Sequence, residues 1–434
     1  MVSIGIIGLG TVGGGVAEIL ERRKDRIRDR VGAELILRKA CDLREELSET
    51  SGVSPGSFTT DYREVLEDDS ITLVAVLTGN ADFAFECIKE CFKRGKHVVT
   101  ANKALLASRW REIFTLSRES GCLIYFEASV GSGIPVIQGI NEGLAANTID
   151  RVKGILNGTS NYILTRMSID SSTLSEAEAL AVKEGFAEVD SSADISGLDA
   201  AHKLCVLANV IFPRPVELDE VYREGIDSIE AIDIEIARDM FSFSVKPLAV
   251  LRRHGDKVEA RVHPALLPED DMLAGVSREN NGILVEGDAV KGVMFYGKGA
   301  GRYPAASAVV SDIIYLAQKI NYGVAGRIPY IHTDTGAGTP VLDMNELSFQ
   351  YYLRFMTVDE PGVLSEISGI LGESGVSILS CFQRGRGEEG VPIIMLTHKA
   401  REGALREALS RIDALEAVKK KSVFIRVESD REIE

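Results

Sequence analysis

A glycine-rich turn near the start of the chain constrains the fold more than any other feature. Residues 2–7 form a short apolar run rich in β-branched side chains, which predicts a buried strand. The segment GLGTVG follows at 8–13, and apolar residues at helical spacing continue through Val16, Ile19 and Leu20. Strand, glycine turn and helix in this order are the context of a dinucleotide-binding fingerprint. The pattern predicts a Rossmann domain that binds a nicotinamide dinucleotide, rather than an ordinary tight turn.

Each glycine of this turn has a separate predicted role. Gly8 allows the tight turn, Gly10 lets the backbone approach a pyrophosphate, and Gly13 lets helix and strand pack closely. The N-terminus of the following helix faces the phosphates, so Thr11 and Val12 are also candidate cofactor-binding residues.

Charged residues after the second predicted strand, 34–41, bear on the choice of cofactor. Asp42 stands where a carboxylate accepts hydrogen bonds from a ribose 2′-hydroxyl, which favours NAD. Arg44 would instead hold the 2′-phosphate of NADP, and Lys39 adds a further positive charge. The sequence leaves NAD and NADP open, and a solvated loop would also explain these charges.

Polar residues also follow two later predicted strands, one at 71–77 and one that begins at Lys96. In a doubly wound sheet, ligands bind beyond the carboxyl ends of the strands. The candidates at these ends are Thr78, Gly79, Thr100, Asn102 and Lys103. Lys103, predicted to lie in a loop before a helix at 108–120, is expected to be functional, although a surface lysine is the plain alternative.

An acidic segment at 183–204 is the second unusual stretch. Its acidic residues are Glu184, Glu188, Asp190, Asp194 and Asp199. Serine, aspartate and glycine predict a loop over 185–199, and a helix should follow at 199–211. Asp199 and Lys203 are four residues apart and would share one face of that helix. This arrangement suits a polar substrate that carries an amine, and the alternative is an acidic surface loop with an exposed ion pair.

Composition excludes several classes of protein. The chain of 434 residues is long enough for two or three domains. Its net charge of −16 argues against nucleic acid or an anionic membrane surface as a partner. No apolar run approaches the ~20 residues of a membrane-spanning helix, and the N-terminus does not resemble a signal peptide. Six cysteines without a CxxC pair fit a reduced, cytoplasmic protein, in which Cys87 and Cys91 are packing residues.

The middle of the chain is an α+β region. The predicted strands are 152–156, 223–226, 246–252 and 258–262, and the predicted helices are 175–184, 199–211 and 232–241. Before it, the segment FEASVGSGIP at 126–135 follows a predicted strand at 122–127 and reads as an interdomain hinge or a set of carbonyls for a hard cation. After it, a glycine-rich loop at 297–301 precedes a predicted helix at 304–319, and 324–347 reads as a connector.

The last eighty or so residues predict a module of their own. Strands are expected at 349–357, from 375, at 391–397 and at 422–427, with a turn at 359–364 into one helix and another helix at 401–412. The order βαββαβ is the ferredoxin-like arrangement.

Together these segments resemble the homoserine dehydrogenase family over essentially the whole chain. The segments that carry the resemblance are GLGTVG, GKHVVTANKAL at 95–105, FEASVGSGIP, LNGTSNYIL at 156–164 and GFAEVDSSADISGLDAAHKL at 185–204. The C-terminal DEPGVL module is similar to an ACT domain. The resemblance implies an α/β protein with four parts: a Rossmann domain at 1–130 with 304–323, an α+β substrate and dimerisation domain at 131–303, a connector at 324–348 and a ferredoxin-like ACT domain at 349–428.

The resemblance also implies a reaction and roles for matching residues. Aspartate 4-semialdehyde would be reduced reversibly to homoserine with NAD or NADP. Lys103 and Lys203 would transfer protons, and Glu188, Asp194 and Asp199 would bind the substrate, with Thr159 beside them. Gly301 would lie at the cofactor. Glu127, Val130, Ser132 and Ile134 would hold a sodium ion, mostly through backbone carbonyls, which replaces the hinge interpretation.

For the ACT module the resemblance implies feedback by threonine. The effector would lie near Asp359, Gly362, Val363 and Leu364, at a contact between modules of a homodimer or homotetramer. A dimerisation domain that binds nothing is the alternative. For the whole chain, the alternatives are a reductase of another amino-acid aldehyde and a non-catalytic amino-acid sensor, although a sensor has no evident need for both lysines.

Some residues depart from the family pattern. Phe186 replaces a tyrosine and Ser191 a proline, so the acidic loop is expected to be braced differently. Val76 replaces a glutamate and Asn80 a glycine. Arg302 and Ala305 alter the glycine-rich loop, where Arg302 is expected to crowd the nicotinamide or contact a 2′-phosphate. These changes bear on rate and cofactor preference more than on the type of reaction.

Overall fold

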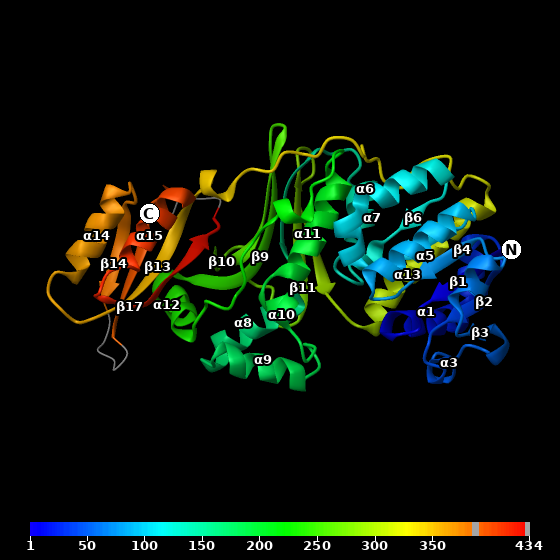
Figure 1. The fold of residues 1–434 in the computed structure, drawn as a ribbon, viewed down its shortest axis with the longest axis horizontal. Coiled ribbons are helices and arrows are strands. Elements are labelled where there is room, and N and C mark those ends of the chain that lie inside the picture. Colours follow the sequence, from blue (N-terminus) through cyan, green and yellow to red (C-terminus); the bar gives the residue numbers. More distant parts are fainter. Residues whose placement is uncertain (384–389, 430–434) are drawn as a thin grey trace. The chain divides into compact units, whose positions relative to one another are not determined.

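The structure is a computed structural model that describes residues 1–383 and 390–429 (Figure 1). The chain forms two compact units. Unit 1 comprises Met1–Val152, Ala201–Val221 and Asn280–Pro340, and unit 2 comprises Lys153–Ala200, Tyr222–Glu279 and Val341–Glu434. These units are the compact parts of the structure. Their limits do not coincide with the predicted domain limits, which divide the chain by type of fold.

Unit 1 is built on a six-stranded parallel sheet. The strand order is β3-β2-β1-β4-β5-β6. The strands are β1 Val2–Ile7, β2 Leu35–Cys41, β3 Phe58–Thr59, β4 Leu73–Val76, β5 His97–Thr100 and β6 Ile124–Tyr125. This is the Rossmann strand order, in which the chain reverses direction across the sheet between β1 and β4 and ligands bind beyond the carboxyl ends. The predicted fold of this region is confirmed.

Two groups of helices accompany this sheet (Figure 1). In one group, α13 (Arg302–Asn321) contacts α1 (Thr11–Arg22) and α2 (Lys24–Val31). In the other group, α5 (Ala81–Lys93) contacts α4 (Tyr62–Glu67) and α6 (Lys103–Ser120). The smaller elements of unit 1 are α3 Glu46–Thr50, η1 Pro55–Ser57, η2 Glu127–Ser129, α7 Val136–Gln138, η3 Gly139–Gly143, η4 Leu218–Glu220 and the hairpin of β11 Asn280–Gly287 with β12 Lys291–Lys298. Two elements, β7 Ile149–Ile155 and α11 Leu198–Ile211, belong partly to each unit.

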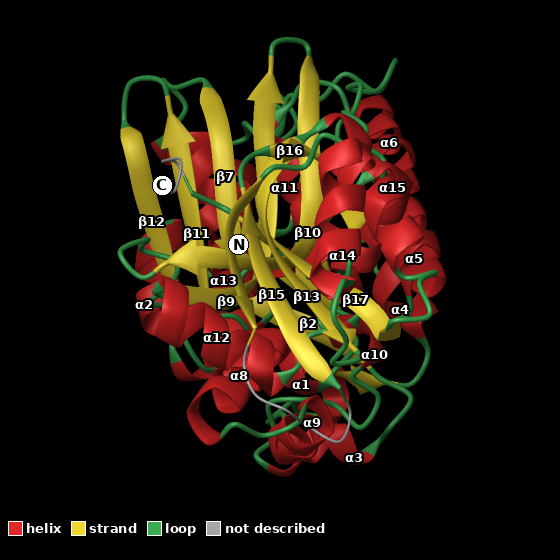
Figure 2. Ribbon diagram, turned by 90° about the vertical axis from the view of Figure 1, so that its left-hand side faces the viewer, coloured by secondary structure: helices red, strands yellow, loops and turns green. Residues whose placement is uncertain are grey.

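Unit 2 contains the strands of the C-terminal module and strands from the middle of the chain in one sheet (Figure 2). Its order is β9-β10-β17-β13-β15-β14. The bounds are β9 Phe243–His254, β10 Lys257–Pro268, β17 Val418–Val427, β13 Ser348–Thr357, β15 Val391–Thr397 and β14 Ile378–Gln383, with short strands β8 Tyr222–Arg223 and β16 Ala400–Arg401 beside them. The join is a parallel pairing of Ala265 with Arg426 and of Leu266 with Val427.

Alternating residues of β13 pack on two different layers. Tyr351, Leu353 and Phe355 belong to a buried cluster with the two helices of the C-terminal module, α14 Val363–Glu373 and α15 Glu402–Ile412. Tyr352, on the opposite face, belongs to a cluster with helices from the middle of the chain. Those helices are α8 Gly158–Asp170, α9 Leu174–Lys183 and α12 Ala231–Phe241. The predicted βαββαβ arrangement is confirmed, and the face of its sheet opposite its own helices is buried within the same chain.

Several predicted elements need correction. The helix expected at 108–120 begins at Lys103, because the Asn102 side chain caps it and accepts the backbone N–H of Leu105 at 3.0 Å. The predicted loop at 185–199 contains a short helix, α10 Ser192–Ile195. The strands predicted at 122–127 and 223–226 are only two residues long. The helices α2 and α8 and the β11–β12 hairpin were not predicted, and the expected glycine loop at 297–301 begins inside β12.

The structure bears on the expectations for the cysteines and for membrane-spanning helices. Cys87 and Cys91 are fully buried in α5, as expected of packing residues. No helix within the described residues is long and apolar enough to cross a membrane.

Candidate active site

The glycine turn after β1 has the geometry that its spacing predicts. Gly8 has φ +98°, and a Cβ there would lie 2.9 Å from the carbonyl carbon of Leu77. A Cβ on Gly13 would lie 1.9 Å from the Gly8 carbonyl oxygen, so only glycine allows this contact between α1 and the turn. A Cβ on Gly10 would meet nothing closer than the Arg44 guanidinium, at 3.6 Å. The protein itself therefore does not require glycine at position 10, which is what is expected of a site where a cofactor approaches.

Asp42 and Arg44 form a pair at the edge of this turn. The Asp42 carboxylate accepts the backbone N–H of Leu9 at 2.8 Å and the Arg44 Nε at 3.1 Å. Burial opposes ionisation of Asp42, but the hydrogen bonds from Arg44 and Leu9 lower its pKa below the usual value. Asp42 therefore braces the glycine turn as an anion, and the exposed guanidinium of Arg44 lies beside Gly10.

Thr100 and Asn102 join the carboxyl ends of β4 and β5. The Thr100 hydroxyl donates to the Val76 carbonyl at 2.9 Å. The Asn102 side-chain amide donates to the carbonyls of Thr78 at 3.0 Å and Gly79 at 3.3 Å. These bonds hold the two loops against each other and set the start of α6, so Thr100 and Asn102 act on the site through the backbone.

Lys103 and Lys203 lie near the N-terminal ends of two helices, α6 and α11. Lys103 is the first residue of α6, and Lys203 is buried in the second turn of α11. The thiol of Cys205 lies 3.7 Å from the Ala107 carbonyl of α6. Since Ala107 is one turn after Lys103 and Cys205 is two residues after Lys203, the N-terminal parts of both helices adjoin. This contact joins the parts of α6 and α11 that carry the two lysines, which are 100 residues apart in the sequence.

An acidic pair in unit 2 is held by one amide. The Asn157 Nδ2 donates to the Asp194 carboxylate at 2.5 Å and to the Asp199 carboxylate at 2.8 Å. Asn157 is itself fixed as the N-cap of α8, because its Oδ1 accepts the backbone N–H of Ser160 at 2.7 Å. The Ser160 hydroxyl donates to the Asp194 carbonyl at 2.8 Å. Two carboxylates so placed present negative charge where an ammonium group would bind.

The sequence interpretation missed this role of Asn157, which it treated only as part of a polar turn after a strand. An asparagine directly before a helix is a capping signal. That signal would have fixed the position of its side chain, although not its carboxylate partners.

The acidic loop between α9 and α11 is held in place by other side chains. The Thr159 hydroxyl donates to the Phe186 carbonyl at 2.9 Å, so Thr159 supports the loop rather than presenting a free hydroxyl. The Phe186 ring packs against Tyr162, with centroids 4.9 Å apart, and the Ser191 hydroxyl donates to Glu178. Glu188 is exposed and, within the described part of the chain, has no hydrogen bond or ion pair. The structure thus brings Asp194 and Asp199 together but leaves Glu188 outside the pair.

Comparison with known proteins shows to which family this chain is similar. The family model described as homoserine dehydrogenase matches residues 135–314, and its NAD binding domain matches residues 8–127. The homoserine dehydrogenase of Pseudomonas aeruginosa is 39% identical over 431 residues, covering 98% of this chain and 99% of that protein. The enzyme of Neisseria gonorrhoeae is also 39% identical, covering 99% of each. The chain belongs to the homoserine dehydrogenase family.

Solved structures of this family support the assignment and the fold. A crystal structure of a homoserine dehydrogenase from Thiobacillus denitrificans matches with a TM-score of 0.92 and 38% identity over 98% of both chains. A hyperthermophilic archaeal homoserine dehydrogenase in complex with NADPH matches with a TM-score of 0.62 and 27% identity, over 74% of this chain and 98% of that one. The resemblance drawn from the sequence is confirmed, and the chain is an oxidoreductase that uses a nicotinamide dinucleotide.

Residues that depart from the family pattern have local explanations in the structure. Asn80 caps α5 and accepts the backbone N–H of Phe83 at 2.9 Å, and Val76 is buried in β4. Arg302, for which a place at the nicotinamide or at a 2′-phosphate is expected, donates to Glu18 at 3.3 Å, and its side chain lies against Gly15 of α1. Gly301, just before α13, has φ +124° and permits this entry into the helix.

The four residues with an expected role in sodium binding are all buried. Burial raises the pKa of Glu127 to about 7. Its two carboxylate oxygens accept the backbone N–H groups of Ile137 at 2.8 Å and Gln138 at 2.7 Å. The Ser132 hydroxyl is buried with no hydrogen-bond partner, so this part of the segment retains an unsatisfied oxygen that suits a hard cation. Among the described residues, no cluster of His, Cys, Asp and Glu side chains could hold a metal on its own, so backbone carbonyls would have to complete such a site.

The family model for the ACT domain matches residues 351–417. Within unit 2 a cavity of about 450 Å³ opens at the N-terminus of α14. Its lining includes the four residues expected to hold an effector: Asp359, Gly362, Val363 and Leu364. Gly362 has φ +101°, which lets the chain turn sharply into the helix.

Proposed function

We propose that the chain catalyses the reversible reduction of L-aspartate 4-semialdehyde to L-homoserine with NADPH or NADH. The observation that carries this proposal is the pair Asp194 and Asp199, held by the amide of Asn157. Asp199 lies in the first turn of α11, and the buried Lys203 follows one turn later on the same helix. One helix thus carries a group for the substrate amine and a group for a proton.

The acidic pair would bind the α-ammonium group of the substrate. An amide donor between two carboxylates reduces their mutual repulsion and leaves further oxygen lone pairs for an ammonium. The Ser160 and Asn157 side chains fix the backbone and side chain of Asp194, so the site is pre-formed before the substrate arrives. Glu188, exposed on the loop, would contribute only if the loop closes on the substrate.

The lysines would supply the proton. When bound, the reduced cofactor provides a hydride to the aldehyde carbon. Negative charge then develops on the aldehyde oxygen, and the ammonium of Lys203 or Lys103 stabilises it and donates the proton that completes the hydroxyl group. In the oxidation of homoserine the neutral lysine accepts the same proton.

For the cofactor we infer that NADP is used at least as well as NAD. The Arg44 guanidinium is exposed beside Gly10, where the adenosine ribose is expected. The carboxylate of Asp42 is already engaged by Leu9 and Arg44, so it is less available to accept hydrogen bonds from a 2′-hydroxyl.

Sodium is part of the same proposal. Val130, Ile134, Glu127 and Ser132 would hold the ion through oxygen atoms, and the unpartnered Ser132 hydroxyl supports this. The ion would stabilise the segment between β6 and α7.

Threonine would bind in the cavity at the start of α14 and lower activity. A buried network in unit 2 offers a connection: Arg426 of β17 donates to Glu224 at 3.0 Å, and the backbone N–H of Ile226 donates to the Ile195 carbonyl at 3.0 Å. Ile195 is the residue after Asp194. A shift of β17 would therefore change the position of the acidic pair, provided that threonine favours one of two states.

The protein would act as a homodimer or homotetramer in the cytoplasm.

The proposal is tested by identifying the product. Purified protein with aspartate 4-semialdehyde and NADPH should form homoserine, measured by mass spectrometry, while glutamate 5-semialdehyde should be converted far more slowly. Preference for the longer aldehyde would favour the alternative of a different amino-acid aldehyde reductase. Binding of dinucleotide without any product would favour the sensor.

A further inference from the structure

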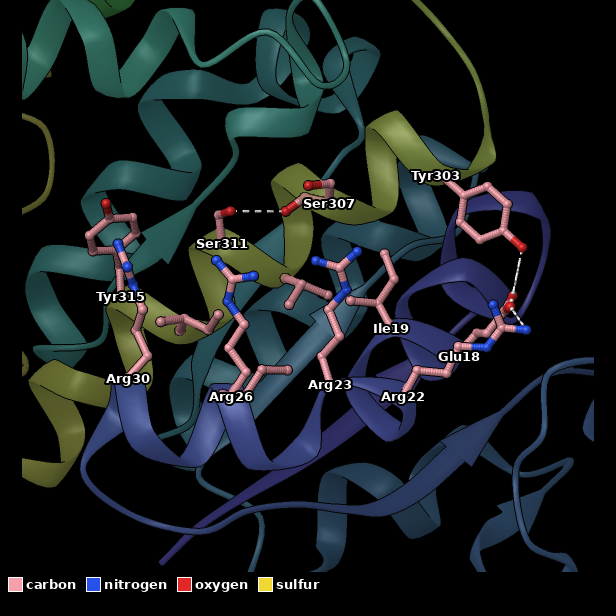
Figure 3. A pocket seen from close by; sticks show the side chains of 13 residues that line it. Glu18, Ile19, Arg22, Arg23, Arg26, Arg30, Tyr303, Ser307, Ser311 and Tyr315 are labelled. Atoms are coloured by element: carbon pink, nitrogen blue, oxygen red, sulfur yellow. Dashed lines mark hydrogen bonds and ion pairs between the residues drawn. The ribbon is translucent and has the colours of Figure 1, made fainter.

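A groove lined by arginines lies in unit 1, beside the C-terminal half of α1 (Figure 3). It is a cavity of about 550 Å³ between the α1–α2 segment and α13. Four arginines line it: Arg22, Arg23, Arg26 and Arg30. The hydroxyl groups of Tyr303, Ser307, Ser311 and Tyr315 line the α13 side, and Ile19, Ile27, Val310 and Ile314 contribute apolar surface.

Three of these guanidinium groups have no counter-charge. Arg22 is paired with Glu18 at 2.8 Å, and Glu18 also accepts from Arg302 and Tyr303. Arg23, Arg26 and Arg30 form no hydrogen bond or ion pair through their side chains with any residue that the structure describes. Figure 3 shows their guanidinium groups directed toward α13. The groove therefore concentrates positive charge on a chain whose net charge is −16.

Helix stability accounts for Arg30, in the last turn of α2, and for Arg23, at the C-cap of α1, but not for Arg26. Arg26 lies in the first turn of α2, where the helix dipole disfavours a cation. Arg26 and Arg30 are four residues apart on one helix, which places like charges side by side and costs about 0.2–0.5 kcal/mol. The acids of α2 do not relieve this, because Asp25 and Asp29 are both near Arg28, at 3.1 Å and 3.7 Å.

We propose that this groove is a binding site for a short chain of linked phosphates, as found in tripolyphosphate or a nucleoside triphosphate. Arg26 and Arg30 are separated by roughly 6 Å along the axis of α2, from four residues at a rise of about 1.5 Å, and Arg23 lies just before this helix. Guanidinium groups bind phosphate oxygens through paired hydrogen bonds, and the hydroxyls of Ser307 and Tyr315 add donors on the opposite wall. The overall negative charge disfavours nucleic acid and other long polyanions, so a small ligand that fits within the groove is expected. This site is separate from the cofactor turn and does not depend on the proposed reaction.

The direct test is calorimetric titration of the full-length protein with tripolyphosphate, in the presence of saturating NADP so that the cofactor site is filled. The paired variant Arg26→Gln/Arg30→Gln should weaken binding at least roughly tenfold, since each charge-assisted hydrogen bond contributes about 1.5–3 kcal/mol. A second variant, Ser307→Glu, places a carboxylate at an exposed position in the groove and should abolish binding. Arg28→Ala, on the same helix but paired with aspartates, should bind as the parent protein does.

Competing ligands identify the source of the phosphates. ATP that binds more tightly than tripolyphosphate would indicate a nucleotide, and equal affinity would indicate that the phosphate chain alone is recognised; both support the site. Equal binding of citrate would contradict recognition of linked phosphates. Unchanged binding in Arg26→Gln/Arg30→Gln, loss of binding in Arg44→Ala, or no binding by the parent protein at millimolar tripolyphosphate would overturn the proposal. None of these outcomes depends on turnover.

Discussion

The side-chain amide of Asn157 lies 2.8 Å from the carboxylate of Asp199, and the same nitrogen also donates to Asp194. Asn157 comes from the turn between β7 and α8, whereas the two acids come from the segment that leads into α11. One neutral residue thus connects two motifs that are about forty positions apart. Its position makes the amide as important to the acidic pair as either carboxylate.

Two replacements of Asn157 should therefore distinguish its role as N-cap of α8 from its hydrogen bonds to Asp194 and Asp199. Asn157→Ser keeps a capping oxygen but removes the amide, whereas Asn157→Ala removes both. Both variants should lower kcat/KM for homoserine about 10- to 100-fold, because each loses a hydrogen bond to a charged group worth about 1.5–3 kcal/mol. Only Asn157→Ala should also lose about 1 kcal/mol of stability, the usual value of a helix cap. Steady-state kinetics and urea denaturation measure the two effects, and normal kinetics in both variants would show that the amide does not serve the substrate site.

The Arg44 guanidinium should discriminate between the cofactors. Arg44→Ala is expected to raise KM for NADP at least roughly tenfold, the cost of one charge-assisted hydrogen bond to a phosphate. KM for NAD should change less than about twofold, because NAD has no 2′-phosphate to lose the contact. Initial rates with each cofactor measure both values. Equal effects on NAD and NADP would mean that Arg44 acts only by bracing Asp42.

The ACT cavity should respond to a change at Asp359. Asp359→Ala removes a carboxylate that would bind the ammonium group of threonine, so inhibition by threonine should require at least roughly tenfold more effector. The rate without threonine should stay unchanged. Dose–response curves of the parent protein and the variant compare the two, and unchanged inhibition in the variant would place the effector elsewhere.

The buried ion pair between Glu402 and Arg426 should make stability depend on pH. Their atoms lie 2.6 Å apart, and both side chains are fully buried. Burial opposes ionisation of Glu402, but the bond from Arg426 lowers its pKa below the usual value. A carboxyl with a lowered folded pKa stabilises the fold above its unfolded pKa of about 4.3, and this contribution is lost as pH falls through the folded value.

Glu402→Gln should consequently destabilise the protein by about 3 kcal/mol at neutral pH, because the buried Arg426 loses one of its two anionic partners and keeps only Glu224. The difference from the parent protein should shrink as the pH falls below about 4.3. Glu373→Gln removes an exposed ion pair with Arg411 and should change stability little. Urea denaturation at several pH values tests this, and a difference that stays constant from pH 7 to 3 would contradict the assignment of the charge to Glu402.

The regular parts of the fold could be predicted because local sequence determines them. The GLGTVG turn requires glycine at two positions for steric reasons, and β15 was predicted at the residues where the structure has it, Val391–Thr397. Features that depend on partners distant in sequence could not be predicted. The parallel pairing of β10 with β17 joins residues 161 positions apart, and the ion pair of Arg354 with Asp233 buries both side chains between β13 and α12.

These distant contacts alter one expectation in particular. The C-terminal module reads as a self-contained unit in the sequence, yet Asp233 relies on Arg354 and Tyr352 of that module as partners. Removing the module would leave a buried carboxylate unpaired, so substitutions such as Asp359→Ala are the better test of regulation than truncation. Arg302 is a similar case, because only the packing of α13 on α1 reveals that Glu18 is its partner.

The central claim is that Lys203 is one of the two lysines that transfer protons between the protein and the substrate. The most direct test follows absorbance of the reduced nicotinamide with L-homoserine and NADP or NAD, for the parent protein and for Lys203→Ala. The parent protein should turn over, and the variant should lose at least roughly a hundredfold in kcat, within the range for removal of a general acid–base group, while still binding NADP. Turnover by Lys203→Ala at the parental rate, or no turnover by folded parent protein with either cofactor, would contradict the account.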